Sequence, residues 1–275
     1  MTSVGAWLTD ALAARSAGEG AVARLDCELL LSHLLKVPRT TLLARPETPI
    51  PEAALAPLND GVDELRRGVS VFYLLGRREF WGIDFKLTRD VLVPRPDTEL
   101  LVESTLKHVA AGQRVVDLGT GSGAIAVALA SEVPSLDVTA SDCSAAALTV
   151  ARANADAAQV RCRFVRADWW QGLNGTFDVV VSNPPYIRAD DPHLAALQDE
   201  PALALVGGED GLAALRKIID GAPAHLADNG WLLLEHGYDQ GAAVRDLCRQ
   251  AGFGDVHTLK DLGGQERVTL GRLRR

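Results

Sequence analysis

The sequence is poor in the features that mark membrane, secreted and metal-binding proteins. Its longest apolar stretches, such as Ala124 to Ala130, are far shorter than the roughly 18 residues that a membrane-spanning helix needs. Met1–Gly20 lacks the basic start and apolar run of a signal peptide. The four cysteines form no C-x-x-C pair, and the six histidines have no metal-ligand spacing. We therefore expect a cytoplasmic protein with reduced thiols and without a bound metal.

An excess of positive charge is also missing. The 275 residues include 28 Lys and Arg against 36 Asp and Glu, which gives a net charge of −8. A protein that holds the phosphate backbone of a nucleic acid over a broad surface needs a basic face. We therefore expect no extended nucleic-acid surface.

The first part of the chain has the pattern of a small helical domain. Apolar residues recur at helical spacing over Val4–Leu12 and Leu25–Leu35. A proline-rich connector, residues 46–57, separates these stretches from a further helix over Leu58–Arg67. No residue type or spacing here points to chemistry. The pattern predicts a helical N-terminal domain over residues 1–72.

A β-hairpin and a rigid link are expected over residues 73–95. Apolar and polar residues alternate well enough over Leu74–Leu87 for two short strands. Pro94-Arg95-Pro96 then favours extended backbone, since the prolines fix φ and restrict the residue before them. A helix is expected to begin near Thr98, with Asp97 as its N-cap.

Residues 96–275 alternate between short apolar strands and helical stretches, which is typical of an α/β fold with a mostly parallel sheet. The strand candidates are Arg114–Leu118, Asp137–Ser141, Arg161–Arg166, Phe177–Ser182, Trp231–Glu235, Asp255–Thr258 and Arg267–Leu270. The helices between them are Ala124–Glu132, Ala145–Ala157, Leu212–Leu226 and Tyr238–Ala251. The last two strands have no helix between them, which predicts an antiparallel pair at one edge. The long connector over residues 186–211 is a candidate active-site loop.

A glycine loop follows the first of these strands. Gly119-Thr120-Gly121-Ser122-Gly123 has the spacing G-x-G-x-G, whereas a dinucleotide fingerprint has G-x-G-x-x-G, and the lysine of a P-loop is absent. Glycines let the backbone approach a ligand and adopt positive φ. The loop lies outside the carboxyl end of a strand, where open α/β sheets bind ligands. The loop favours S-adenosylmethionine over a nucleotide; a tight turn without a ligand is the alternative.

Polar and aromatic residues end the next two strands. Asp142 is placed to accept hydrogen bonds from both ribose hydroxyls, or else to cap the helix that opens after Ser144. Asp168 is placed to take the adenine amino group, and Trp169 to cover the adenine ring. Trp169 and the adjacent Trp170 could equally be core residues.

The fourth strand runs into Asn183-Pro184-Pro185-Tyr186. Two consecutive prolines remove two backbone donors, so that carbonyl groups face the site. The side-chain carbonyl of Asn183 and the backbone carbonyl of Pro184 can accept both hydrogens of one –NH₂ group. Such acceptors orient a conjugated amine toward a sulfonium methyl, with Tyr186 packed on the flat face of the target. The alternative is a proline turn after a strand.

Three further motifs accompany these elements. They are Pro94-Arg95-Pro96-Asp97-Thr98-Glu99, Glu200-Pro201-Ala202-Leu203 and Gly207-Gly208-Glu209-Asp210-Gly211. Together the motifs resemble those of the release-factor glutamine N5-methyltransferases, the PrmC/HemK family, and the resemblance covers nearly the whole chain. Two of the motifs, Glu200-Pro201 and Arg95 with Thr98 and Glu99, are interpreted as a loop anchor and a helix start.

The resemblance implies a Rossmann-like methyltransferase domain over residues 96–275 and an N-terminal domain that docks the substrate. The family methylates the glutamine of the Gly-Gly-Gln tripeptide in class I peptide chain release factors and converts S-adenosylmethionine to S-adenosylhomocysteine. Carried over by motif, the glycine loop, Asp142, Trp169 and Asn183 contact the cofactor, and residues 183–186 hold the glutamine amide. Catalytic roles are expected for Asn183, Pro184 and Tyr186, in a protein that acts as a monomer.

Other functions stay open at this point. Adenine N6-methyltransferases share the Asn-Pro-Pro-Tyr element, although the charge and the lack of a target-recognition domain disfavour them. Glutamine methylation of a different protein and a non-catalytic binding module are further alternatives. The chain also contains Gly263-Gly264-Gln265, for which a plain turn is expected rather than self-methylation.

Overall fold

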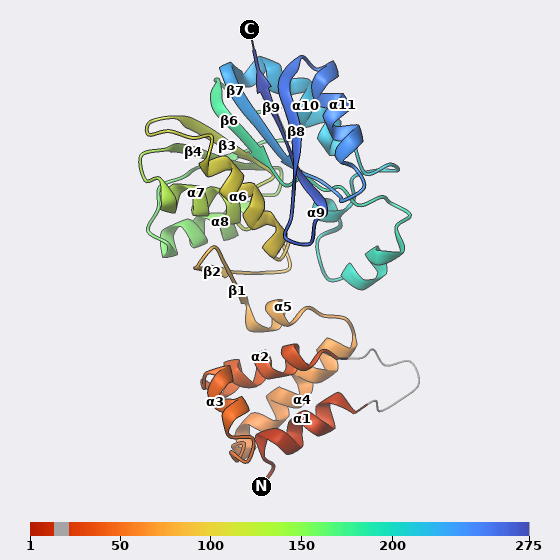
Figure 1. Ribbon diagram of the computed structural model, residues 1–275. Coiled ribbons are helices and arrows are strands. Elements are labelled where there is room, and N and C mark those ends of the chain that lie inside the picture. Colours follow the sequence, from red (N-terminus) through yellow and green to blue (C-terminus); the bar gives the residue numbers. More distant parts are fainter. Residues whose placement is uncertain (14–21, 275) are drawn as a thin grey trace. The chain divides into compact units, whose positions relative to one another are not determined.

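The chain folds into two units, each built around its own apolar core (Figure 1). The computed structural model describes residues 1–13 and 22–274. One unit consists of Met1–Arg77 with Ala196–Asp199, and the other of Arg78–Ala195 with Glu200–Arg275. No helix in these described ranges is long and apolar enough to cross a membrane.

The first unit is helical. Its helices are α1 (Val4–Leu12), α2 (Arg24–Leu35), α3 (Arg39–Ala44), α4 (Glu52–Arg66) and α5 (Val71–Leu75). The periodic apolar residues of α1 and α2 pack against Leu58 and Val62 of α4. Trp7 of α1 also donates through Nε1 to Asn59 Oδ1 at 3.0 Å. The apolar spacing therefore decides which faces of these helices meet.

Two features of this unit differ from the expectation. α3 was not predicted, because a helix of six residues is too short to show a period; it begins directly after Pro38, whose φ is −55°. α4 begins at Glu52, so the expectation that Pro57 lies in a connector is wrong. Pro57 is tolerated inside the helix because it removes only one backbone donor, while the buried Leu58 and Val62 hold the helix in place.

The expected β-hairpin is confirmed, with shorter strands. β1 (Arg77–Phe80) pairs with β2 (Ile83–Lys86), because α5 already occupies the residues up to Leu75. The two turn residues, Trp81 and Gly82, have φ of 54° and 70°. Positive φ at both positions gives a turn whose twist matches that of the flanking strands.

The second unit contains a seven-stranded sheet with the order β5-β4-β3-β6-β7-β9-β8. Its strands are β3 (Arg114–Leu118), β4 (Asp137–Asp142), β5 (Arg163–Arg166), β6 (Phe177–Ser182), β7 (Leu226–Glu235), β8 (Phe253–Lys260) and β9 (Glu266–Leu273). β5, β4, β3, β6 and β7 are parallel, whereas β9 is antiparallel to both β7 and β8. The predicted α/β fold with an antiparallel edge is confirmed.

Helices cover both faces of this sheet (Figure 1). They are α6 (Glu99–Leu106), α7 (Ala124–Glu132), α8 (Ala145–Ala157), α10 (Ala213–His225) and α11 (Gly241–Gln250). Val115 packs with α6, α7 and α8 on one face, while the next residue, Val116, packs with α10 and α11 on the other. This alternation follows from the two-residue period of a strand, and it makes the central strands apolar on both sides.

The start of α6 differs from the expectation that Asp97 caps this helix. Pro96–Thr98 form a 3₁₀ turn, and α6 begins at Glu99 without a side-chain cap. Asp97 instead pairs with Arg267 of β9, with 3.3 Å between Oδ2 and Nη2. The prediction that Asp97 caps the helix is therefore wrong, because a basic partner from a distant strand takes the carboxylate.

Candidate active site

The carboxyl ends of the parallel strands border a cavity of about 600 Å³, a size that suits a small-molecule ligand. Residues at or just after the ends of β3, β4, β5 and β6 line one part of the cavity. Among them are Gly119, Thr120, Gly121, Ser122, Asp142, Asp168, Trp169, Asn183 and Pro185. Residues 89–98 and 201–217 complete the wall, among them Arg95, Thr98, Leu203 and Lys217. The described part of the chain thus brings most of the predicted site residues together.

The glycine loop is held by the neighbouring strand. The amides of Gly119 and Thr120 both donate to the carbonyl of Ser141, at 2.9 and 2.8 Å. Gly119 and Gly121 have φ of 73° and 55°, a region that side chains rarely adopt. Gly123 does not line the cavity; it precedes α7 with φ of 84°, and an added Cβ would lie 3.1 Å from that of Ala151. Its place is in the packing of α7 against α8.

Asp117 supports the glycine loop through a hydrogen bond, and it was not among the site residues predicted from the sequence. It is fully buried at the end of β3, and its Oδ2 accepts from Thr120 Oγ1 at 2.6 Å. Burial raises the pKa of Asp117 to about 7, although hydrogen bonds from Thr120 and the amide of Ala126 oppose the shift. Among the described residues, Oδ1 of Asp117 has no hydrogen-bond partner.

Asp142 lines the cavity and organises the backbone around it. Its Oδ2 accepts from the amide of Gly121 and its Oδ1 from the amide of Ser144, both at 2.9 Å. Ser144 itself caps α8, because its hydroxyl accepts from the amide of Ala147 at 3.2 Å. The side-chain cap of the helix is therefore Ser144, and Asp142 connects that helix start to the glycine loop.

The two adjacent tryptophans have different places. Trp169, with φ of 52°, lines the cavity, and its ring edge lies 3.4 Å from an ideal Cβ built on Gly119. Trp170 does not line the cavity: its Nε1 donates to the carbonyl of Ile218 at 3.0 Å, and its ring stacks on His225 with 4.6 Å between centroids. One tryptophan therefore lies at the cavity and the other packs against α10.

Of the four residues that follow β6, some line the cavity and others do not. Asn183 and Pro185 line the cavity, whereas Pro184 and Tyr186 do not. The ring of Tyr186 packs against the core on the α10 face, and its hydroxyl donates to Glu235 Oε1 at 3.3 Å. Burial raises the pKa of Tyr186 well above its ordinary value. This places Tyr186 behind the wall and not, as expected, with its ring toward the cavity.

Buried polar groups lie behind Asn183, and two of them were not among the predicted site residues. Asn183 donates through Nδ2 to Thr98 Oγ1 at 3.1 Å. Glu235, at the end of β7, accepts from the hydroxyl of Tyr186 at 3.3 Å. Thr98 and Glu235 are both buried, and Thr98 also lines the cavity. Because these residues come from distant segments, no local pattern in the sequence could have joined them.

The connector after Tyr186 is folded and not structureless. It contains a 3₁₀ helix, η2 (Pro192–Leu197), and α9 (Ala202–Leu205). The buried side chain of Glu200 accepts from the amide of Val93 at 3.2 Å and pairs with the guanidinium of Arg95. Glu200 thus ties the segment before α6 to the segment before α9, and both segments line the cavity.

The Gly263-Gly264-Gln265 sequence forms the turn between β8 and β9. The amide of Gln265 donates to Asp261 Oδ1 at 2.9 Å, and its carbonyl accepts from the amide of Asp261 at 2.8 Å. Gly264 has φ of 81°, as the turn requires. Gln265 does not line the cavity, so its place agrees with the plain turn that was expected.

Comparisons with known proteins show which family the chain is similar to. Residues 6–76 match a family model described as the PrmC N-terminal domain, and residues 96–199 match one described as the methyltransferase small domain. A release factor glutamine methyltransferase of Xylella fastidiosa is 48% identical, over 91% of this chain and 94% of the relative. One of Pseudomonas aeruginosa is also 48% identical, over 91% of this chain and 92% of the relative.

Solved structures share the fold of the second unit. A methyltransferase from Pyrococcus furiosus superposes with a TM-score of 0.56 at 21% identity, over 70% of this chain and 90% of that one. The E. cuniculi Mtq2–Trm112 complex, described as methylating the translation termination factor eRF1, gives a TM-score of 0.50 at 25% identity. That match covers 67% of this chain and 99% of the other.

Proposed function

Because the chain belongs to the release factor glutamine methyltransferase family, we propose that it transfers a methyl group from S-adenosylmethionine to the side-chain amide nitrogen of the glutamine in the Gly-Gly-Gln motif of class I release factors. The observation that carries the proposal is the orientation of Asn183 at the cavity wall. Its –NH₂ group is engaged by Thr98, which leaves its carbonyl oxygen to accept a hydrogen from a substrate amide. An acceptor fixed in this way suits a neutral, conjugated amine.

The residues around the glycine loop fit S-adenosylmethionine. Positive φ at Gly119 and Gly121 lets the backbone border the cavity without a Cβ, and an ideal Cβ on Gly121 would meet no atom within 4 Å. We propose that the loop holds the methionine part of the cofactor, Asp142 the ribose hydroxyls and Trp169 the adenine ring, with Asp168 at the adenine amino group. The bound cofactor supplies an electrophilic methyl group on a sulfonium.

The chain's own residues would orient the nucleophile. The nitrogen of an amide is a poor nucleophile because its lone pair is delocalised. The side-chain carbonyl of Asn183 would accept one of its hydrogens, which concentrates electron density on nitrogen and directs it at the methyl group. Pro185 would border the same subsite, while Tyr186 supports the wall from the core side. Such a transfer requires no covalent intermediate on the enzyme.

We further propose that the helical unit docks the release factor, since the residues assigned to chemistry all lie in the second unit. The working division is a docking domain over residues 1–72, a hairpin and link over 73–95 and a methyltransferase domain over 96–275. The net charge of −8 supports a protein substrate over a nucleic acid. The four free cysteines support action in the reducing cytoplasm.

Methyl transfer to purified substrates tests the function. Labelled S-adenosylmethionine is incubated with the protein and a release factor, and with a release factor whose motif carries Gln→Ala. We expect label in the first and none in the second. Label in the Gln→Ala protein, or in added DNA or RNA and not in the release factor, would contradict the proposal.

The cofactor assignment is tested separately by calorimetric titration of Asp142→Ala. Loss of a charged hydrogen-bond acceptor should weaken S-adenosylmethionine binding by about ten- to a hundredfold. An unchanged dissociation constant would mean that Asp142 serves only the backbone amides of Gly121 and Ser144.

A further inference from the structure

We propose that Gln240, Gly207 and Gly211 are positioning residues for the methyl transfer, which hold the backbone of the acceptor loop, residues 183–187, at the cavity wall. The proposal rests on the function proposed above, and it gives a role to the glycine motif of residues 207–211, to which that function assigns none. It is carried by the hydrogen bonds of the Gln240 side chain and by the close approach of the two glycines to this backbone.

The side chain of Gln240 is directed at the acceptor loop. Gln240 is buried at the start of α11, but its side chain does not cap that helix. Its Nε2 donates to the carbonyl of Tyr186 at 3.0 Å and to the carbonyl of Gly211 at 3.4 Å. Its Oε1 accepts from the amide of Gly237 at 2.9 Å. Because Gly237 holds the acceptor end of this amide, the –NH₂ end must face the loop.

The two glycines lie against the acceptor loop where no side chain would fit. An ideal Cβ on Gly207 would lie 2.6 Å from the carbonyl oxygen of Pro185 and 2.6 Å from that of Gly211. An ideal Cβ on Gly211 would lie closer still to the carbonyl oxygen of Tyr186, and Gly211 has φ of 74°. Glycine permits both the approach and this backbone conformation. The amide of Gly207 also donates to the carbonyl of Ile187 at 2.8 Å, so the motif packs directly on the loop.

A displacement of this backbone would reach Asn183. Pro184 and Pro185 have fixed φ, so the acceptor loop has few dihedral angles through which a displacement could relax. Asn183 and Pro185 both line the cavity, and Asn183 carries the proposed acceptor of the substrate amide. Misplacement of an orienting group by about 1 Å lowers a rate by about 100-fold. The contacts of Gln240 therefore affect the chemical step, although Gln240 itself does not line the cavity.

Two variants test the positioning role by steady-state kinetics on a release factor. Gln240→Met removes the hydrogen bonds of the side chain at similar volume, and Gly207→Ala adds a Cβ that crowds the carbonyl of Pro185. Each should lower kcat by about 10- to 100-fold, because the acceptor is misplaced. The KM for S-adenosylmethionine should stay within about threefold of the wild-type value, because the glycine loop after β3 is unchanged.

A merely structural role is separated by counting the folded sites. Calorimetric titration with S-adenosylmethionine gives the number of binding sites per chain, and kcat is then expressed per site. A variant that only unfolds loses sites but keeps the wild-type kcat at each remaining site. A misplaced acceptor loop instead lowers kcat per site. Gln240→Asn, which keeps the amide but is one methylene shorter, replaces Gln240→Met if that variant binds no cofactor.

Two matched controls lie away from the cavity. Gly230→Ala in β7 adds a Cβ at 2.9 and 3.0 Å from the backbone carbonyl oxygens of Ala227 and Asp178. Thr269→Val removes the hydrogen bonds of another buried side chain. Neither Gly230 nor Thr269 lines the cavity. Both controls should destabilise the protein and leave kcat per site unchanged.

The outcomes separate this inference from the proposed function. A wild-type protein that methylates no release factor overturns the function itself. An active wild type, together with unchanged kcat per site in either test variant, overturns only the positioning role. A fall in kcat per site in either control as large as in the test variants also overturns it, because the effect would then not depend on the acceptor loop.

Discussion

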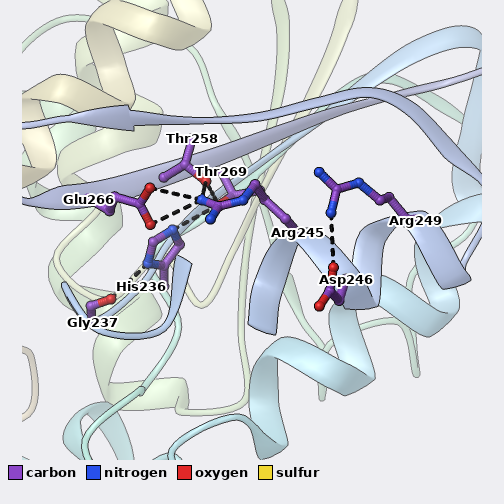
Figure 2. A network of polar contacts seen from close by, with 8 residues as sticks. All are labelled: His236, Gly237, Arg245, Asp246, Arg249, Thr258, Glu266 and Thr269. Carbon is purple, nitrogen blue, oxygen red and sulfur yellow. Dashed lines mark hydrogen bonds and ion pairs between the residues drawn. The ribbon is translucent and has the colours of Figure 1, made fainter. Parts of the chain in front are cut away.

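Glu235 and His236 are neighbours in the chain, yet each belongs to a different buried polar network. Glu235 ends β7, and its Oε1 accepts from the hydroxyl of Tyr186 at 3.3 Å. His236 faces β8, β9 and α11, as Figure 2 shows. Its Nδ1 donates to the carbonyl of Gly237 at 2.9 Å, and its Nε2 therefore accepts from Thr269 Oγ1 at 2.8 Å. The side-chain alternation of an extended strand thus places two titratable groups in two settings.

The network of His236 is closed. Thr269 is joined to Thr258 at 2.7 Å, and Arg245 donates both to Thr258 at 2.7 Å and to the carboxylate of Glu266 at 3.0 Å (Figure 2). None of its side chains is among the described groups that are buried without a partner. Glu235, in contrast, has an Oε2 atom without a hydrogen-bond partner among the described residues. A closed network stabilises the fold, whereas a buried polar atom without a partner destabilises it.

The largest effect is expected from removing the side chain of Asn183 at the cavity wall. Asn183→Ala should lower the initial rate of release factor methylation by about 10²–10³-fold, because one preorganised group at the reacting centre is lost. The free energy of unfolding should change little, since Asn183 is at the cavity wall. Rate assays and urea denaturation of the same preparation measure both. Turnover close to that of the wild type would contradict the assigned chemistry.

Asn183→Asp sharpens the same test. The variant keeps an acceptor of the same size but loses the –NH₂ group. A carboxylate at position 183 cannot donate to Thr98 Oγ1, which accepts from Nδ2 of Asn183 at 3.1 Å, so the side chain loses the contact that orients it. We therefore expect the rate to fall as far as in Asn183→Ala. Substantial activity of the Asp variant would show that Thr98 does not hold the amide.

The next effect is a difference in pH dependence between the two networks. Burial raises the pKa of Glu235 from 4.5 to about 7, so the folded state loses stability as pH rises between these values. The free energy of unfolding of Glu235→Gln minus that of the wild type should therefore be larger at pH 8 than at pH 4.5, by up to about 3 kcal/mol. Urea denaturation at both pH values measures this. The same gain at both pH values would show that Glu235 does not titrate in this range.

The pKa of His236 is shifted in the opposite direction, and the pH dependence of its contribution to stability is opposite as well. Burial lowers the pKa of His236 below its ordinary value of 6.5, so its contribution to stability is present above that pH and is lost as pH falls. Wild type and Glu235→Gln share His236, so its contribution cancels in their difference.

A smaller effect is expected from Thr269→Val, which removes one hydroxyl group from the hydrogen-bond network of His236. The variant leaves Nε2 of His236 without its donor, which should lower the free energy of unfolding by about 1–3 kcal/mol. Turnover of the folded protein should not change. Thr139→Val serves as the control, because the hydroxyl of Thr139 has no partner to lose among the described residues. Equal stability of the two variants would mean that the network contributes nothing.

The smallest effect is expected at the exposed pair beside the closed network. Arg249 and Asp246 on α11 lie 2.9 Å apart, with both side chains more than half exposed (Figure 2). Such pairs contribute about 0–1 kcal/mol, so Arg249→Ala should change the free energy of unfolding by less than about 0.5 kcal/mol. A larger loss in urea denaturation would show that the network extends to the surface of α11.

The sequence predicted the elements best where an apolar run or a capping residue marks their ends. Both ends of β3, β6, α7 and α8 were predicted correctly. The first three are mostly buried apolar runs, whereas α8 is amphipathic and begins after its cap, Ser144. β8 is longer than predicted, because its buried and exposed residues alternate and give little apolar signal. β7 begins earlier than predicted, and its pairing with β6 is interrupted between Leu226 and Trp231. Such an irregularity has no signature in hydrophobicity alone.

The candidate site was predictable where it depends on strand ends. The glycine loop, Asp142, Trp169 and Asn183 all follow strands and all line the cavity, apart from Gly123. The orientation of the Tyr186 side chain was not predictable, because its ring could pack either in the core or against the cavity. Thr98 and Glu235 were missed for a related reason: the bond from Asn183 to Thr98 spans 85 positions of sequence. Only the folded sheet brings such residues together.

The two contacts of the Glu200 carboxylate also determine whether the two segments of the cavity wall separate one at a time or together. One of its oxygens accepts from the amide of Val93, while the other pairs with Arg95. Breaking either contact alone would leave a buried charge partly uncompensated, which is costly. Half-open states are therefore rare, and the segments around Val93 and Glu200 form one cooperative unit of local unfolding. Hydrogen exchange at the amide of Val93 reports directly on the opening of that unit.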